Sequence, residues 1–257
     1  MQNITQQNKN PKLALIVIGN EILSGRTLDK NTQYIAQMVG KFGIDLVEVR
    51  FIPDYEGEII TAVNNLRERY DYVFTTGGIG PTHDDITTEC IAKAFGVEVE
   101  LNQMAYSLLV EYYGGEGNLN PGRIKMAMLP QGAELVLNPV SAAPGFRVGN
   151  VFVMAGVPKI MQAMLDNVVP MLRHGTQVES KTVQVVAAES KVAALLTELQ
   201  NTYPDVQIGS YPYMQSDGYD HVGTNVVFRS INKNRVEEAV RVLVKKLKDE
   251  TNFEFKL

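Results

Sequence analysis

Residues 73–85, with the sequence VFTTGGIGPTHDD, constrain the fold more than any other part of the chain. An apolar segment typical of a buried strand runs directly into Gly77, Gly78 and Gly80. Because glycine has no Cβ atom, such a turn can bring backbone N–H groups close to a bound anion. A polar segment and a helical pattern follow the turn. The stretch therefore predicts a strand, a tight turn and a helix in succession.

The expected helix covers residues 85–95 and ends at Gly96. Thr82 is predicted to be its N-cap, with Asp85 at the N3 position of a capping box. Unpaired N–H groups and the dipole at a helix N-terminus favour negative charge, so the turn is a candidate phosphate site. The adjacent carboxylates of Asp84 and Asp85 repel a phosphate unless a cation lies between them. The motif thus predicts a metal-bridged phosphate or pyrophosphate.

The same residues also fit a purely structural role. Glycine turns between strands and helices are common, and Asp is ordinary in the first turn of a helix. The pattern is not a P-loop, which requires GxxxxGK[ST], nor a dinucleotide fingerprint, because His83 stands where a glycine would fall. We expect His83 to be exposed, with a general acid or base role as the alternative. The motif alone leaves both interpretations open.

Residues 13–18 form a continuous apolar run, as expected of a strand buried on both faces of a sheet. Strand and helix patterns then alternate, which predicts βαβ units and a mostly parallel sheet covered on both faces. We expect an α/β domain over residues 12–174, with a Gly/Asn-rich loop at 114–122. The other strands are expected at 44–52, 72–75, 134–137 and 151–154, and the helices at 31–39, 55–69, 103–113 and 158–172.

A change in composition near residues 174–180 predicts a domain boundary. Beyond it the patterns read strand, helix, strand, strand, helix, which predicts a small α+β domain over residues 180–257. This domain has no glycine–carboxylate cluster of its own. Its strands are expected at 182–187, 206–211 and 223–229, and its helices at 191–200 and 236–248.

The net charge of −5 gives no electrostatic reason to expect a nucleic acid as the partner. No apolar stretch approaches the ~20 residues that span a membrane. Residues 1–10 are polar, so we expect a disordered leading segment and not a signal peptide. The single cysteine, Cys90, excludes an internal disulfide. We expect a cytoplasmic protein.

A second polar cluster, residues 18–31, directly follows the first predicted strand. Ligands of open parallel sheets gather outside the carboxyl ends of the strands, so this cluster and the glycine turn are expected to be neighbours. Glu21 then adds a third carboxylate to Asp84 and Asp85, and these oxygens suit magnesium or manganese. In the alternative interpretation, Glu21 is a surface residue and Asn31 is only an N-cap.

Two further turns are candidates for contacts with a phosphate. Residues 141–146 form a small-residue turn, and residues 154–161 form another strand-to-helix turn with a glycine. Arg123 and Lys125 flank the expected loop and could neutralise phosphate charge. Ordinary turn chemistry is the alternative in each case.

Five short motifs follow one another within residues 12–174: IGNEILSGRTLDKN at 18–31, TGGIGPTHDD at 76–85, LPQGA at 129–133, NPVSAAPGF at 138–146 and MAGVP at 154–158. Their order resembles the molybdopterin-binding superfamily of molybdenum-cofactor biosynthesis proteins, most closely the N-terminal domain of competence/damage-inducible protein A. Two positions depart from the family pattern. Ala155 replaces a proline of the last motif, and Met126 stands where the family commonly has a glutamine after Lys125.

The resemblance implies a three-layer α/β/α fold in a homo-oligomer, a dimer or trimer, that binds a nucleotide or pterin phosphate at the glycine turn. Within the family we expect a short stand-alone member, without the C-terminal amidase domain of the full-length proteins. The resemblance also implies a divalent metal (Mg, Mn or Co), with Asp84 and Asp85 as catalytic residues that bind the metal together with Glu21. The implied substrate-binding residues are Gly19, Glu21, Asn31, Thr76, Gly77, Gly78, Gly80, Thr82, Lys125, Ala143, Gly145 and Gly156.

Three functions are compatible with these residues. The first hypothesis is metal-dependent hydrolysis of the pyrophosphate in a substrate such as ADP-ribose or FAD. The second is a non-catalytic module that binds molybdopterin or an adenine nucleotide, which Met126 and Ala155 favour and the intact pair Asp84 and Asp85 opposes. The third is adenylylation of molybdopterin at the same site.

Overall fold

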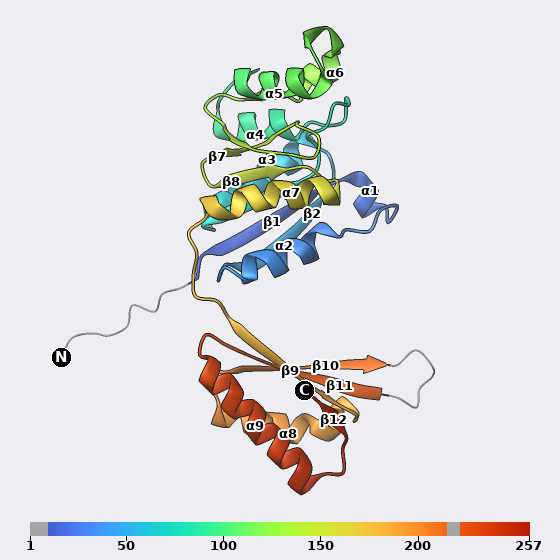
Figure 1. Ribbon diagram of the computed structural model, residues 1–257, viewed down its shortest axis with the longest axis vertical. Coiled ribbons are helices and arrows are strands. Elements are labelled where there is room, and N and C mark those ends of the chain that lie inside the picture. The colour runs from blue at the N-terminus through green and yellow to red at the C-terminus, as the bar shows by residue number, and fades with distance from the viewer. Residues whose placement is uncertain (1–9, 215–221) are drawn as a thin grey trace, which may run out of the picture. The chain divides into compact units, whose positions relative to one another are not determined.

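The computed structural model describes residues 10–214 and 222–257 of this chain, which divides into two compact units (Figure 1). The first unit ends at Thr176 and the second begins at Gln177. Apart from Asn10, the predicted leading segment lies outside the described residues.

The first unit is built on a six-stranded sheet with the strand order β2-β1-β3-β8-β7-β6. The four strands from β2 to β8 are parallel, whereas β7 is antiparallel to both of its neighbours. The predicted, mostly parallel sheet is therefore confirmed. The strands are β1 (Lys12–Ile18), β2 (Asp45–Ile52), β3 (Tyr72–Thr76), β6 (Glu134–Val136), β7 (Gly145–Val148) and β8 (Val151–Met154).

Helices cover both faces of this sheet, which confirms the three-layer α/β/α architecture. In β1, Ala14, Ile16 and Ile18 pack in one apolar core with α3 (Glu56–Arg67) and α4 (Thr87–Phe95). The alternate side chains, Leu13, Leu15 and Val17, pack in a second core with α2 (Asn31–Gly40) and α7 (Pro158–Val168). All six side chains are buried, as a strand between two helical layers requires.

The expectation of a loop at residues 114–122 is wrong in part. After α5 (Gln103–Tyr113), this segment contains the 3₁₀ helix η1 (Glu116–Asn118) and the start of α6 (Pro121–Lys125). The side chain of Asn120 caps α6 by accepting a hydrogen bond from the N–H of Arg123, and Pro121 occupies the first helical position. Two capping residues in succession therefore begin a helix inside a Gly/Asn-rich stretch. The short strands β4 (Val99–Leu101) and β5 (Met128–Pro130) pair beside these helices.

The second unit has an antiparallel sheet with the order β10-β11-β9-β12, which confirms the predicted α+β class. Both helices pack in a single apolar core with one face of this sheet (Figure 1). The elements are β9 (Glu179–Val185), α8 (Glu189–Thr202), β10 (Gln207–Met214), β11 (Val222–Ser230), α9 (Lys233–Glu250) and β12 (Phe255–Lys256). Among the described residues, no helix has both the length and the apolarity needed to cross a membrane.

The register of the first sheet brings three loops together. Val17 lies opposite Thr76, and Thr76 lies opposite Met154, so β1, β3 and β8 end at the same edge. The helix α1 (Asn20–Leu23), the glycine turn and the turn before α7 all begin at this edge. Parallel strands thus place the predicted motifs side by side.

Candidate functional site

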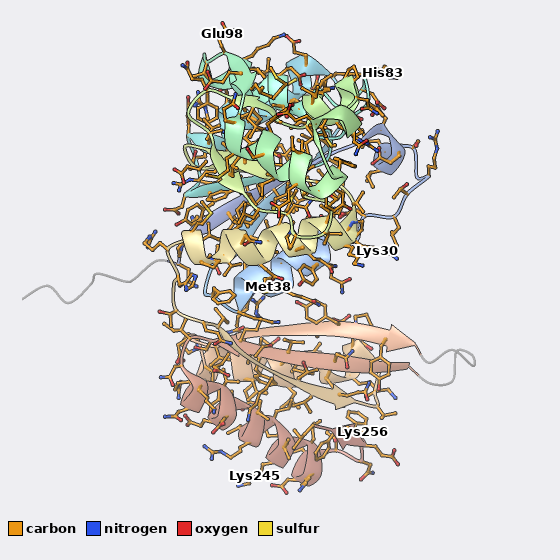
Figure 2. The ribbon with its side chains drawn as sticks, turned by 45° about the horizontal axis from the view of Figure 1, so that its top comes forward. Lys30, Met38, His83, Glu98, Lys245 and Lys256 are labelled. Carbon is orange, nitrogen blue, oxygen red and sulfur yellow. The ribbon has the colours of Figure 1, made fainter. Side chains whose placement is uncertain are left out.

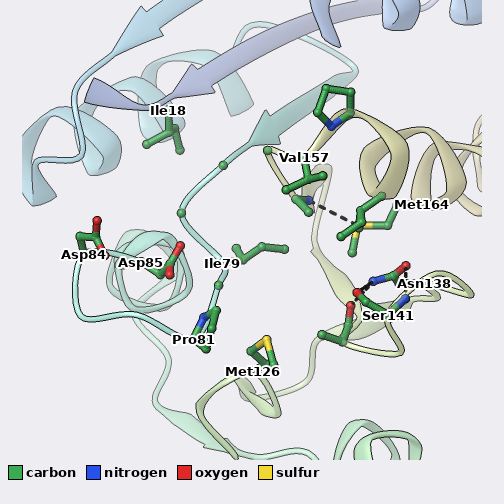
Figure 3. A pocket seen from close by; sticks show the side chains of 18 of the residues that line it. Ile18, Ile79, Pro81, Asp84, Asp85, Met126, Asn138, Ser141, Val157 and Met164 are labelled. Atoms are coloured by element: carbon green, nitrogen blue, oxygen red, sulfur yellow. Dashed lines mark hydrogen bonds between the residues drawn. The ribbon is translucent and has the colours of Figure 1, made fainter. Parts of the chain in front are cut away.

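A cavity of about 600 Å³ lies at the carboxyl ends of β1, β3 and β8. The segment that follows the glycine turn, residues 82–85, is called the acidic loop because it contains Asp84 and Asp85. Figure 3 shows this loop on one side of the cavity and Asn138, Ser141 and Met164 on the other. Eight of the predicted site residues line it, namely Glu21, Gly77, Gly78, Gly80, Asp84, Asp85, Ala143 and Gly156.

The glycine turn fits its surroundings so closely that side chains are excluded. Gly77 and Gly78 have φ angles of 106° and 69°, in the left-handed region that favours glycine. A Cβ atom on Gly77 would lie 2.2 Å from the carbonyl oxygen of Ile18. The N–H of Gly77 donates to the carbonyl of Met154 at 3.1 Å, so this group is already paired within the protein. The turn is shaped chiefly by close packing against the two neighbouring strand ends.

The prediction that Thr82 caps the helix is wrong, although one bond of the predicted capping box forms. The helix α4 begins at Thr87, and no side chain caps it. The residues before it form a separate turn in which Asp85 Oδ2 accepts the N–H of Thr82 at 2.9 Å and also its hydroxyl. Thr87 instead ties the helix to the glycine turn, because its buried hydroxyl donates to the carbonyl of Gly77 at 3.0 Å. The N–H of Thr87 is also paired, at 2.9 Å from the carbonyl of Gly78.

The two carboxylates of the acidic loop differ in their surroundings. Asp84 is exposed, and Asp85 is half-buried with its Oδ2 bound to Thr82. The pKa of Asp84 lies below its usual range, chiefly because the neighbouring Thr82 hydroxyl and the backbone N–H of Asp84 favour the charged carboxylate. His83 and Lys125 have smaller effects in the same direction. Asp84 is therefore ionised at neutral pH. His83 is exposed, as predicted, at the edge of the first unit (Figure 2).

The cavity carries negative charge only. Four carboxylates line it, those of Glu21, Asp54, Asp84 and Asp85, whereas none of the described lysine, arginine or histidine side chains does. Lys125, predicted to face a phosphate, lies outside the lining and donates to the carbonyls of Thr82 and Asp85 at 2.7 and 2.6 Å.

A divalent metal is compatible with the donor atoms of this cavity, because carboxylate oxygens are the ligands that Mg²⁺ and Mn²⁺ prefer. Within residues 10–214 and 222–257, however, no three acidic, histidine or cysteine side chains are grouped closely enough to hold a metal ion. Glu21 therefore lines the same cavity as Asp84 and Asp85 without forming a ready set of three ligands.

Asn31 connects two loops at the edge of the cavity. It is the first residue of α2 and not its N-cap, and its buried amide donates to the carbonyl of Gly156 at 2.8 Å. Lys30 is the N-cap, and the carboxylate of Asp29, one residue earlier, accepts the N–H of Asn31 at 2.9 Å. A Cβ atom on Gly156 would lie 3.3 Å from the Cα of Gly77, so the turn before α7 lies directly against the glycine turn. The bond from Asn31 to the carbonyl of Gly156 holds it there.

A second cavity, of about 50 Å³, adjoins this contact and is lined by Glu21, Asn31, Thr76 and Gly156 among others. The Oδ1 of Asn31 and the hydroxyl of Thr76 are both buried and have no hydrogen-bond partner in the described part of the chain. The remaining predicted residues, Gly19, Thr82 and Gly145, line neither cavity. Gly145 has a packing role in β7, where a Cβ atom would lie 2.3 Å from the carbonyl oxygen of Val153.

Sequence reasoning missed several residues of the large cavity. Asp54 follows β2, the neighbour of β1, and its carboxylate accepts the N–H of Asn20 at 2.8 Å, so strand order was the signal that could have identified it. Asn138 is buried and donates to the Ser141 hydroxyl and to the carbonyl of Ala143 at 2.7 and 2.9 Å. These bonds shape one wall of the cavity. Tyr113, the last residue of α5, also lines it, as does Met126, which the sequence marked only as a departure from the family pattern.

Comparison with known proteins relates the two units to different families. Residues 14–174 match the profile described as "Probable molybdopterin binding domain", and residues 177–254 match that of the FAD synthase middle domain. A protein of Caldivirga maquilingensis is 36% identical over 246 residues, which cover 91% of this chain and 96% of the relative. A protein of Archaeoglobus fulgidus is 34% identical over 235 residues, covering 91% and 97%. The crystal structure of CinA from Thermoplasma acidophilum, a protein of unknown function, matches with a TM-score of 0.59 at 34% identity and covers 63% of this chain and 98% of that chain.

Proposed function

Because this chain belongs to the family of the probable molybdopterin binding domain, we propose that it is a metal-dependent hydrolase of a pyrophosphate bond. The proposed substrate is a dinucleotide-like molecule such as ADP-ribose or FAD. The observation that carries the proposal is the pairing of a close-fitting glycine turn with Asp84 and Asp85 in a cavity lined by carboxylates. Such a cavity repels a free pyrophosphate and accepts one that a divalent cation accompanies.

The residues of the acidic loop are suited to hold that cation. Asp84 is ionised at neutral pH and exposed, so its oxygens are available as ligands. Magnesium commonly uses one or two carboxylates together with oxygens of the substrate phosphates, so a preformed set of three protein ligands is not required. A bound metal would offset the charge that develops on oxygen as water attacks phosphorus and the phosphoanhydride bond breaks.

The apolar part of the cavity lining favours a substrate with a flat ring. Ile79, Met126, Val157, Ile160 and Met164 contribute apolar surface to the lining of the cavity. A nucleobase, flavin or pterin ring buries well against such side chains while its phosphates face the carboxylates. Met126, in the position where a polar contact was expected, adds to this apolar surface.

Two alternatives use the same cavity. A non-catalytic binding module is supported by the lack of a grouped set of three metal ligands among the described residues. An adenylyltransferase that acts on a pterin shares the requirement for a metal and a phosphate. The match of the second unit to the FAD synthase middle domain is the reason to include FAD among the test substrates.

The proposal is tested by incubating the purified protein with ADP-ribose, FAD and NAD in the presence of Mg²⁺, Mn²⁺ or Co²⁺. We expect release of two nucleoside or sugar monophosphates from at least one substrate. Binding without any product, measured by calorimetry with the same substrates, would support the binding module instead. In a separate incubation with ATP and molybdopterin, transfer of AMP to the pterin with release of pyrophosphate would support the transferase.

A further inference from the structure

Two residues from different helices attach the acidic loop to the rest of the first unit, Thr87 where the loop meets α4 and Lys125 at its tip. At its base, Thr87 bonds to the carbonyls of Gly77 and Gly78, as described above. At its tip, the only side chain from outside the loop that bonds to residues 82–85 among the described residues is that of Lys125. Lys125 is 40 positions away from Asp85 in the sequence. The loop is therefore held by α4 on one side and by α6 on the other.

The contacts of Lys125 are made to the backbone and not to the carboxylates. Its ammonium has three hydrogen atoms, and two of them point to the carbonyls of Thr82 and Asp85, at 2.7 and 2.6 Å. Hydrogen bonds from a charged donor are among the stronger ones in proteins. The side chain is half-buried and does not line the cavity. In this position the ammonium fixes the backbone on both sides of Asp84.

The helix that carries Lys125 is itself firmly placed against the loop. A Cβ atom on Gly122 would lie 3.0 Å from the carbonyl oxygen of Pro81, so α6 approaches the loop closely. The guanidinium of Arg123 lies 3.8 Å above the ring of Tyr113, which joins α6 to α5. Lys125, the last residue of α6, thus extends from a fixed support.

We propose that Lys125 is a positioning residue that holds the acidic loop in one conformation, so that Asp84 and Asp85 present their oxygens to a metal-bound phosphate. It does not itself bind the phosphate. The effect on turnover rests on the proposed function, whereas the effect on the loop is a property of the ligand-free protein. The competing role for this lysine is a direct contact with the phosphate.

Amide hydrogen exchange in the ligand-free protein separates these roles. The N–H of Thr82 is bonded to Asp85 inside the loop, and the N–H of Thr87 is bonded to Gly78 at its base. In Lys125→Met we expect the Thr82 amide to exchange about tenfold faster, the ratio that corresponds to losing roughly one net hydrogen bond. The Thr87 amide should exchange at the wild-type rate. Lys93→Met, which removes an exposed lysine of α4 that pairs with Glu56, is the matched control and should leave both amides unchanged.

Kinetics and binding complete the test. If hydrolysis is detected, Lys125→Met should lower kcat while KM stays within about twofold, because the substrate contacts remain. Its affinity for inorganic pyrophosphate in excess Mg²⁺ should likewise stay within about twofold, because Lys125 does not contact the phosphate in the proposed role. Lys125→Gln serves as the second variant if Lys125→Met melts at a lower temperature than the wild type. Unchanged exchange at Thr82 together with weaker pyrophosphate binding would overturn the proposal in favour of a direct phosphate contact. If no substrate is hydrolysed, the exchange result still decides the role of Lys125.

Discussion

Gly78 and Thr87 approach each other so closely that only glycine fits at position 78. The N–H of Thr87 donates to the carbonyl of Gly78 at 2.9 Å, and a Cβ atom added to Gly78 would lie 2.2 Å from the Thr87 hydroxyl oxygen. The φ of Gly78 is 69°, where other residues are strained. The glycine turn and the start of α4 therefore depend on each other, and this pair determines where the acidic loop begins.

The first prediction follows from that contact. Gly78→Ala should lower the free energy of unfolding by roughly 2–4 kcal/mol, from the left-handed φ and from the overlap with Thr87. Gly57→Ala is the matched control, because Gly57 lies in α3 with no atom within 4 Å of an added Cβ. Its helix should gain about 0.5–1 kcal/mol. Urea unfolding followed by circular dichroism measures both, and equal stabilities of the two variants would contradict the close contact.

The elements with long, simple patterns were predictable from the sequence. The apolar run of β1 identified a strand between two helical layers, and alternating strand and helix patterns identified the parallel sheet. Local patterns were less reliable where a contact with another element decides the structure. The antiparallel strand β7 was not predicted: the expected turn at 141–146 includes its first two residues, and its pairing with β8 depends on residues that follow it in the sequence.

In the candidate site, too, residue types were predictable from the sequence, whereas roles that depend on contacts between elements were not. The glycine turn and the acidic pair were identified from residue type and spacing. The roles of Asp85 and Lys125 were not, because Asp85 bonds to Thr82 inside a turn of its own and Lys125 bonds to carbonyls of that turn. Residue types show that a lysine is charged, but only the fold shows that its partners are backbone oxygens.

A second prediction concerns Cys90, which is buried in α4. Burial raises the pKa of its thiol to about 11 from the usual 9. Because the pKa is higher in the folded protein, the neutral thiol stabilises the fold fully below about pH 9, and this contribution is lost as the pH rises toward 11. At pH 8 we therefore expect iodoacetamide to alkylate the native protein much more slowly than the protein in urea. Equal rates in the two conditions would show that Cys90 is accessible or ionised.

A third prediction concerns the metal. Because four carboxylates and none of the described basic side chains line the cavity, binding of a nucleoside diphosphate should depend on a divalent cation. The non-hydrolysable analogue α,β-methylene-ADP in excess Mg²⁺ should raise the melting temperature, and EDTA should abolish the shift. Stabilisation follows from mass action when a ligand binds only the folded state. A shift of the same size in EDTA would contradict a metal-bridged phosphate.

The last prediction separates an enzyme from a binding module. Asp84→Asn keeps the size of the side chain and removes one negative charge from an exposed position of the acidic loop. If Asp84 holds the metal during hydrolysis, kcat should fall by roughly a hundred- to a thousandfold, as is typical when one preorganised electrostatic group is removed. Stability should change little, because Asp84 caps no helix and α4 begins at Thr87.

Asp166→Asn, at an exposed position of α7 away from the cavity, is the control and should have wild-type kcat. Turnover and thermal melting of the three proteins would be compared on the substrate found in the panel. A variant at position 84 with wild-type kcat would remove Asp84 from the mechanism. If none of the three proteins turns over any substrate while all bind α,β-methylene-ADP, the cavity belongs to a binding module.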